Sequence, residues 1–186
     1  MTPSTSPAPS LPLIRTVVEI VGAPFHALIT PEDGAIRAAG FATPDDPDAA
    51  SLEQRLARLD PELAARGVAP GQSGAGPVAD ALRAYAAGRL EALDALPVAQ
   101  PETPFRGEVW RALRRVPGGS AVTYTELAAL AGRPQAVRAA ASGCANNLVA
   151  LVVPCHRIVR TDGGLGGYLF GTDIKERLLR HEGAER

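Results

Sequence analysis

The feature that most constrains the fold is a change of pattern at a proline-rich segment near the middle of the chain. Residues 95–104 contain three prolines, which interrupt helices and strands and are typical of a linker. Short strand-like apolar runs precede this segment, and apolar residues at helical spacing follow it. The pattern predicts an α+β protein with a disordered tail over 1–12, a sheet-and-helix domain over 13–95, a linker over 96–103 and a mainly helical domain over 104–186.

The first domain is predicted to contain three short strands and two helices. Residues 16–21, 25–30 and 35–42 are the candidate strands. Ser51 is expected to cap a helix whose leucines recur at helical spacing as far as Leu63. Pro77 suits the first position of the second helix, because the missing N–H is not needed there.

The second domain is predicted to be helical around one buried strand. Thr125 is expected to cap a short helix over 126–131, and Pro134 to open the next helix. Two short helices joined by a glycine-containing turn favour a helix-turn-helix, although such pairs are also common in proteins that bind no DNA. The unbroken apolar run 148–153 is interpreted as a buried strand, and Asp173 with Glu176 fits a capping box for the last helix.

The composition indicates an ordinary globular protein. Hydrophobic residues make up 46% of the chain and charged residues 21%, and no apolar run reaches the roughly 18 residues that span a bilayer. The first ten residues lack the basic region and apolar core of a secretory signal. Two cysteines and three scattered histidines form neither a disulfide framework nor a zinc ligand set. We therefore expect a cytoplasmic protein with no membrane association, no metal and no cofactor.

Charge is distributed unevenly between the two halves. Residues 1–100 hold 7 basic and 12 acidic side chains, a net charge of −5, whereas residues 101–186 hold 12 and 8, a net charge of +4. This asymmetry favours contact between the second half and a polyanion, although chance could also produce it.

The residues with the clearest chemistry are Cys155 and His156, directly after the apolar run. A thiol with a pKa of about 8.5 becomes a better nucleophile when a neighbouring base increases the thiolate fraction. Glu182 in the last helix is a candidate acceptor that would orient the histidine. For an isolated Cys-His pair, the commoner explanation is a buried structural cysteine.

The sequence from Pro154 to Val159, PCHRIV, resembles the signature of the O6-alkylguanine-DNA alkyltransferases, also called methylated-DNA–protein-cysteine methyltransferases. The similarity extends from about Pro104 to Gly183 through TPFRGEVWRALRRVPGG, VTYTELAALAGRPQAVRAAA, NNLVALVVPCHRIV and KERLLRHEG. Residues 13–95 resemble the family's N-terminal domain more loosely. The resemblance implies a ribonuclease H-like first domain and a helical second domain with a helix-turn-helix.

The resemblance also implies the activity. The thiolate of Cys155 would take the alkyl group, mainly methyl, from guanine O6 and also from thymine O4, in a single irreversible turnover. The partner would be double-stranded alkylated DNA, bound through its minor groove by a monomer. His156 would take the thiol proton through a water, and Glu182 would orient the histidine.

Further roles follow from matching positions. Tyr124 would donate to guanine N3, Asn147 would hold the turn before the cysteine, and Arg138 would fill the space left by the flipped base. The remaining matches are small residues that would face DNA and residues of the substrate pocket: Ala139, Ala140, Gly143, Ile158, Tyr168, Leu169 and Phe170. Three positions depart from the family pattern. Leu148 stands where proline is usual, and Phe170 stands where glycine is usual, so its ring is expected to obstruct bulky alkyl groups. Cys144 lies outside the motif and is expected to be structural.

Two other functions are possible for such a sequence. A non-catalytic protein that binds alkylated DNA would lack the acceptor cysteine, which this chain keeps at position 155. A helix-turn-helix regulator would need a dimer interface and an effector domain, and no excess apolar helix face suggests either.

Overall fold

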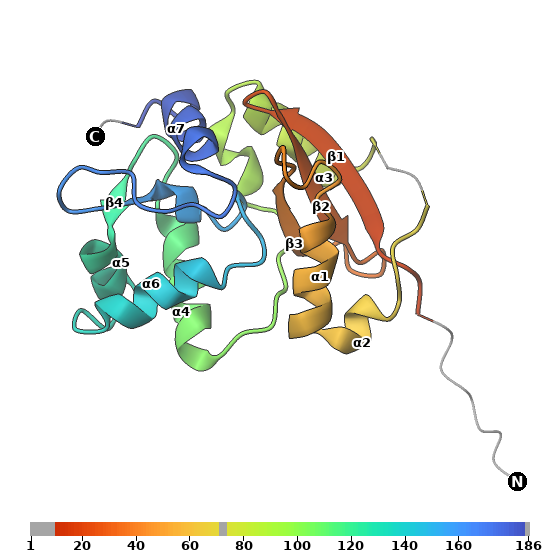
Figure 1. Ribbon diagram of the computed structural model, residues 1–186, viewed down its shortest axis with the longest axis horizontal. Helices are drawn as coiled ribbons and strands as arrows, with labels where there is room; N and C mark the ends of the chain where they lie inside the picture. Colours follow the sequence, from red (N-terminus) through yellow and green to blue (C-terminus); the bar gives the residue numbers. More distant parts are fainter. Residues whose placement is uncertain (1–9, 71–73, 185–186) are drawn as a thin grey trace, which may run out of the picture.

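The computed structural model describes residues 10–70 and 74–184, so most of the predicted tail over 1–12 lies outside the described residues. Figure 1 shows a small sheet with its helices beside a group of helices formed by the second half of the chain. The α+β class predicted from the sequence is confirmed. The predicted division into two domains at residues 96–103 stays a prediction, as does the ribonuclease H-like class of the first.

The sheet consists of β1 (Ile14–Ile20), β2 (Ala23–Ile29) and β3 (Ile36–Phe41), paired antiparallel in that order. All three predicted strands are confirmed within two residues. Val21 and Gly22 form the first turn with positive φ angles of 47° and 76°, a conformation that glycine adopts readily. Most of β2 is buried on both faces, because residues on alternate sides belong to two separate apolar clusters.

Three helices accompany the sheet. α1 (Ala50–Leu59) contacts β3, and α3 (Pro77–Ala86) contacts β1. Pro77 occupies the first turn of α3, as predicted. The helix predicted to continue to Leu63 instead stops at Leu59, and α2 (Pro61–Ala64) follows as a separate turn. Pro61 explains the break, because it has no N–H to continue the hydrogen-bond ladder of α1.

The predicted cap of α1 is wrong. Ser51 lies inside the helix, and the carboxylate of Asp46 accepts hydrogen bonds from the backbone N–H groups of Ala50 (2.8 Å) and Ser51 (3.0 Å). An aspartate from the preceding loop therefore satisfies the free donors at this helix start.

The segment between the two halves is attached to the sheet. It contains a 3₁₀ turn, η1 (Leu90–Leu93). The N–H of Ile36 then donates to the carbonyl of Pro97 (2.9 Å), and the N–H of Ala99 donates to the carbonyl of Ile36 (3.1 Å). Residues 97–99 consequently run along β3, and these hydrogen bonds fix the backbone that leads to the next residues of the chain.

The second half contains α4 (Pro104–Arg115), α5 (Tyr124–Leu130), α6 (Val137–Ala145) and α7 (Thr172–His181). α5 and α6 contact each other and α4. Gly132, with a φ of 81°, ends α5 and begins the short turn to α6.

Three helix starts differ from the sequence prediction. Thr123, not Thr125, caps α5, and a capping box with Glu126 explains the difference. α6 begins at Val137, three residues after Pro134. The capping box predicted for α7 is also wrong, because the Asp173 carboxylate accepts from Arg177 (2.9 Å) on the same helix. None of the helices among the described residues is long and apolar enough to cross a membrane.

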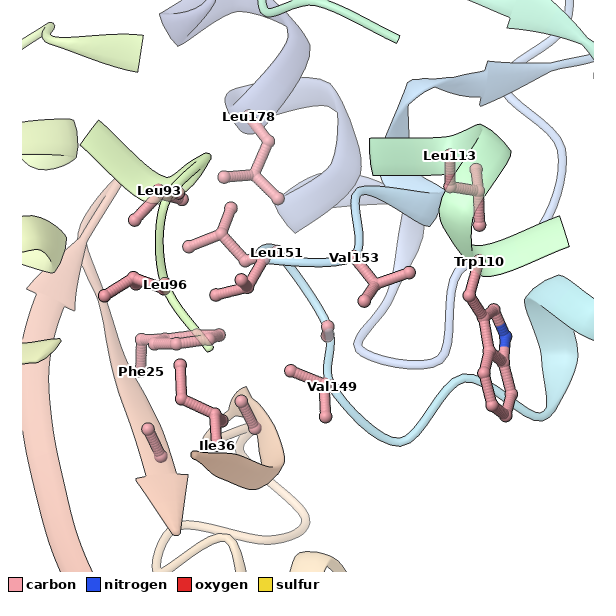
Figure 2. Close-up of a cluster of buried hydrophobic side chains, with 14 of the residues drawn as sticks. Phe25, Ile36, Leu93, Leu96, Trp110, Leu113, Val149, Leu151, Val153 and Leu178 are labelled. Carbon is pink, nitrogen blue, oxygen red and sulfur yellow. The ribbon is translucent and has the colours of Figure 1, made fainter. Parts of the chain in front are cut away.

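Residues 148–153 are buried, as predicted, but they do not form a strand. Only Val149 pairs with the sheet, opposite Ala39. The chain then turns, with the N–H of Val153 donating to the carbonyl of Val149 (3.1 Å) and a φ of 68° at Leu151. Figure 2 shows Val149, Leu151 and Val153 among apolar side chains of both halves, so this segment joins them into one core.

The turn leads into a 3₁₀ helix, η2 (Cys155–Arg157), and a short strand, β5 (Ile158–Val159). β5 runs parallel to β4 (Val122–Thr123), which immediately precedes α5. The buried segment thus fixes where Cys155 emerges from the core.

Candidate active site

A cavity of about 130 Å³ lies between α5, α6, the turn before Cys155 and the loop before α7. We call residues 160–171 the covering loop. Six residues predicted from the sequence line the cavity: Tyr124, Asn147, Cys155, Tyr168, Leu169 and Phe170. The fold therefore brings together side chains that are as many as 46 positions apart in the sequence.

Cys155 remains partly accessible at the start of η2. Burial raises the pKa of its thiol, while a hydrogen bond from Asn147 and the charges of Lys175 and Arg55 act in the opposite direction. The neutral thiol is therefore the resting form, and the surrounding groups favour the thiolate once its proton leaves.

Asn147 closes the turn that presents Cys155. Its Nδ2 donates to the carbonyl of Val153 (2.9 Å) and to Sγ of Cys155 (3.4 Å), while its Oδ1 accepts from the N–H of Val149 (3.1 Å). Arg55 of α1 donates to the backbone carbonyl of Asn147 (3.0 Å). One amide thus connects the buried turn with the thiol, at the position predicted for a turn-holding asparagine.

His156 points away from the cavity and into the core. It is fully buried, and its Nε2 lies 2.9 Å from Oε1 of Glu182. Burial lowers the pKa of His156 although Glu182 opposes this change, so the imidazole is neutral and can accept a proton. Its Nδ1 has no hydrogen-bond partner among residues 10–70 and 74–184.

Two residues that the sequence analysis missed complete the environment of Glu182. Arg157 donates to both carboxylate oxygens (2.9 Å each), and the hydroxyl of Tyr85 in α3 donates to Oε1 (2.7 Å). Burial alone would raise the pKa of Glu182, but the hydrogen bonds from His156 and Arg157 and the charge of Arg157 outweigh it and hold this pKa well below its usual range. Arg157 could have been predicted as a site residue because it directly follows the Cys-His pair. Tyr85 could not, because it lies 97 positions from Glu182 in the sequence.

The sequence analysis also missed Lys175, a fully buried lysine. Its Nζ donates to the carbonyls of Ile158 (2.6 Å) and Gly167 (3.3 Å). The lysine therefore ties the covering loop to the strand that follows the cysteine. Burial lowers the pKa of Lys175, and negative charge on Cys155 would oppose this effect.

Two tyrosines present phenols at the cavity. Burial, and then negative charge on Cys144 and Cys155, raises the pKa of Tyr124; burial raises that of Tyr168 further. Both hydroxyls stay protonated and can donate hydrogen bonds. The Tyr168 hydroxyl oxygen is buried and has no partner within the described part of the chain.

Two predicted pocket residues lie differently than expected. Ile158 is fully buried in β5 and is absent from the cavity wall, so it is a core residue. Phe170 is only 8% exposed and lies edge-on to Phe41, with ring centroids 5.8 Å apart. A side chain at Gly40 would place its Cβ 2.3 Å from the Phe170 ring, so the absence of a side chain in β3 makes room for this aromatic.

The predicted DNA-facing residues divide into an exposed and a buried set. Arg138 and Ala139 are exposed on α6, and Arg138 makes no side-chain hydrogen bond or ion pair that involves another described residue. Ala140 is fully buried, and Gly143 is also buried, with its carbonyl accepting from the indole of Trp110 (3.0 Å). These last two are corrected to packing positions, because Ala140 has no exposed surface and a Cβ at Gly143 would lie 2.9 Å from Val109 of α4.

Cys144 lines the same cavity as Cys155. Burial raises the pKa of Cys144 to about 12, so its thiol stays neutral near neutral pH. Within residues 10–70 and 74–184, no group of three or more histidine, cysteine, aspartate or glutamate side chains could hold a metal ion.

Comparison with known proteins finds matches to the helical half. Residues 104–184 match the family model described as the 6-O-methylguanine DNA methyltransferase, DNA binding domain. A methylated-DNA–protein-cysteine methyltransferase of Shigella flexneri is 46% identical over 108 residues, covering 58% of this chain and 63% of the relative. One from Methanosarcina barkeri is 45% identical over 101 residues, covering 54% and 63%. The aligned part of the chain thus spans less than two thirds of these relatives.

Solved structures extend the similarity to the sheet half. The O6-methylguanine methyltransferase of Mycobacterium tuberculosis has a TM-score of 0.67 and 25% identity, covering 92% of this chain and 93% of that one. The O6-methylguanine-DNA methyltransferase of Pyrococcus kodakaraensis has a TM-score of 0.60 and 26% identity, covering 92% and 99%. Both halves of the fold therefore have counterparts in these proteins.

Proposed function

We propose that this protein repairs DNA by transferring the alkyl group of O6-alkylguanine to Cys155, since residues 104–184 match the family model described as the 6-O-methylguanine DNA methyltransferase, DNA binding domain. The observation that carries the proposal is a thiol that lines a cavity, accepts a hydrogen bond from Asn147 and is followed by a buried His156–Glu182 pair. O4-alkylthymine, with the same alkyl–oxygen bond, is the proposed second substrate.

The reaction requires the thiolate to displace the base from the alkyl carbon. A sulfur–carbon bond forms while the carbon–O6 bond breaks, and the bonding electrons move to the guanine. Tyr124 is proposed to donate a hydrogen bond to N3 of that base as negative charge develops. The product is a thioether on Cys155, which carries no thiol for another cycle, so each molecule reacts once.

The proton of the thiol must leave before or during attack. We assign its acceptance to His156 through a bridging water, since the neutral imidazole has an unpartnered Nδ1 and no direct bond to the sulfur. Glu182 stabilises the resulting imidazolium, and Arg157 and Tyr85 hold the carboxylate in place. This division of roles resembles other nucleophile–base–acid arrangements.

DNA binding is assigned to α5 and α6 as a helix-turn-helix. An enzyme that acts on a stacked base must extrude it, at a cost of a few kcal/mol. Arg138 is proposed to fill the vacated position, and the small Ala139 beside it suits the narrow minor groove, about 6 Å wide. We propose that a monomer acts on duplex DNA in the cytoplasm.

Intact mass spectrometry tests the proposal directly. After incubation with a duplex containing O6-methylguanine, the protein should gain one methyl group, located on Cys155 by peptide mapping. Cys155→Ser should gain none, because a hydroxyl is far less acidic than a thiol. An unmodified parent protein, or methylation retained in Cys155→Ser, would overturn the assignment.

The competing function is binding of alkylated DNA without chemistry. It predicts that the parent and Cys155→Ser bind the lesion equally and that neither changes mass. The retained cysteine and its hydrogen bond from Asn147 favour transfer, and the same mass experiment separates the two functions.

A further inference from the structure

A glutamine from the segment between the two halves contacts the turn that presents Cys155. The Nε2 of Gln100 donates to Oδ1 of Asn147 (3.0 Å), and its Oε1 accepts from the N–H of Leu148 (2.8 Å). One carboxamide therefore pairs with both the side chain of Asn147 and the following peptide. The backbone just before Gln100 is held by the hydrogen bonds between Ile36 and residues 97–99.

These contacts decide which way the Asn147 amide faces. Its Oδ1 receives two donors, from Gln100 and from the N–H of Val149. A flipped amide would set its NH₂ group against both donors and its oxygen against the carbonyl of Val153. The observed orientation leaves Nδ2 facing Val153 and the sulfur of Cys155.

The contact with Leu148 depends on the residue type at this position. Leucine has a backbone N–H, whereas proline, which the family resemblance led us to expect here, has none. A proline would also restrict the turn through its fixed φ. In this chain the turn is restrained instead by the hydrogen bond to Gln100.

We infer that Gln100 is a positioning residue for alkyl transfer, because it holds Asn147 in the orientation that donates to the Cys155 sulfur. The inference rests on the proposed function for its effect on repair, but not for its effect on the thiol. Neither hydrogen bond of the Gln100 side chain is made to the sulfur, so this residue acts through Asn147.

The expected consequence is a change in the acidity of Cys155. A hydrogen bond to sulfur favours the thiolate, and Asn147 supplies one. Removing Gln100 changes no charge, so a shift in the pH profile would report on this hydrogen bond. The titratable and charged groups around the thiol come from five helical elements and the covering loop, and they remain in place: Arg55, Tyr124, Cys144, His156, Tyr168 and Lys175.

The test uses Gln100→Met, which keeps the length of the side chain and removes both hydrogen bonds. Single-turnover methyl transfer should be measured with saturating O6-methylguanine duplex across pH 6–10. We expect the rate near neutral pH to fall about tenfold, which corresponds to one pKa unit in thiolate fraction, and the pH profile to move upward. Duplex affinity should be unchanged.

Two controls separate positioning from general destabilisation. Gln54→Met changes an exposed glutamine of α1 and should leave rate and pH profile as in the parent. In an Asn147→Ala background, Gln100→Met should add little further loss, because its effect passes through that residue. An unchanged pH profile in Gln100→Met would overturn the inference. A further tenfold fall in rate when Gln100→Met is added to Asn147→Ala would also overturn it.

A second readout does not depend on DNA repair. The reaction of Cys155 with iodoacetamide over the same pH range reports its thiol pKa, after subtraction of the Cys155→Ser signal from Cys144. If the parent transfers no methyl group, the proposed function fails, while a raised thiol pKa in Gln100→Met would still support the positioning role. Equal thiol pKa values in Gln100→Met and the parent would reject it.

Discussion

The two sides of the Cys155 segment differ in how their polar groups are satisfied. On the core side, Glu182 accepts hydrogen bonds from His156, Arg157 and Tyr85, and this cluster is almost entirely buried. On the cavity side, the hydroxyl of Tyr168 lacks a partner among the described residues, and Leu169 is 62% exposed. On the core side the carboxylate of Glu182 is fully hydrogen-bonded and only Nδ1 of His156 lacks a partner among the described residues, whereas the cavity side offers donors and apolar surface to a ligand.

This difference matches the two tasks of the proposed reaction. A base that must accept a proton works best with its orienting carboxylate already fixed, so that little reorganisation is needed. A pocket for an extruded nucleotide must instead keep unfilled hydrogen-bonding capacity. Variants on the core side should therefore affect folding and catalysis together, and variants on the cavity side should mainly affect substrate handling.

The largest effect is expected for Arg157→Met. This change leaves the buried carboxylate of Glu182 without its two guanidinium bonds, and breaking a buried pair in this way costs about 3–5 kcal/mol. Urea unfolding should show that loss. Arg160→Met removes an arginine from an exposed pair with Asp162 and should leave the unfolding free energy unchanged within error. Equal effects of the two variants would contradict the buried, completed character of the core side.

Acid should destabilise the protein partly through Glu182. Its pKa in the folded protein lies below the ordinary value of 4.5, so its contribution is present above that pH and is lost as the pH falls toward the folded pKa. One such group adds up to about 1.4 kcal/mol per pH unit to the slope. Glu182→Gln should lower the slope of unfolding free energy between about pH 3 and 4.5. An unchanged slope would show that the carboxylate has no such shift.

His156 adds a separate contribution at higher pH. Its pKa is lowered in the folded protein, so the unfolded chain takes up a proton below about pH 6.5 while the folded imidazole stays neutral. Stability therefore decreases as the pH falls through that range. Because this loss begins about two units above that of Glu182, the two contributions can be resolved by pH titration of the unfolding free energy.

On the cavity side, Arg138→Ala should reduce repair of a paired lesion about tenfold more than repair of the same lesion in a mismatch. A mismatched base costs less to extrude, so a residue that opposes its return matters less there. Arg89→Ala changes an exposed arginine in the sheet half and serves as the matched control. Equal losses on paired and mismatched substrates would assign Arg138 to a phosphate contact instead.

The sequence predicted the sheet and the reactive segment more reliably than the helix starts. Strands were located because their apolar runs are short and separated by turn residues. Helix starts were misplaced where a loop side chain, Asp46, capped α1, and where Thr123 competed with the nearby Thr125 for α5. Caps depend on the geometry of the entering chain, which the one-dimensional pattern does not contain.

The apolar run 148–153 shows a different limit. Its composition predicted burial, which is confirmed, but not an extended backbone, because Leu151 adopts a positive φ inside the core. Small residues on α6 show the same ambiguity, since Ala139 is exposed while Ala140 packs inside. Likewise, the partners of Glu182 come from α3 and η2, so only the folded chain reveals them.

The smallest effect is expected for Phe170, where the sequence alone led us to expect a ring that obstructs bulky alkyl groups. The ring instead sits over Gly40 and against Phe41 and Tyr168, while part of it lines the cavity. Phe170→Leu keeps an apolar side chain in that position but removes ring volume, so the free energy of unfolding should fall by about 0.5–3 kcal/mol. With less bulk at the wall, inactivation by free O6-benzylguanine should become about threefold faster, equivalent to roughly 0.7 kcal/mol, with methyl transfer unchanged.

Gly40→Ala provides the opposing control, because the new Cβ would meet the Phe170 ring at 2.3 Å and force it away from the sheet. If the ring moves toward the cavity, inactivation by benzylguanine should become slower than in the parent. If the displacement instead releases the covering loop, both substrates should react more slowly. Combining the two changes should restore the parent rate, since leucine leaves room for the added methyl group. If Gly40→Ala leaves both rates unchanged, Phe170 does not anchor the covering loop.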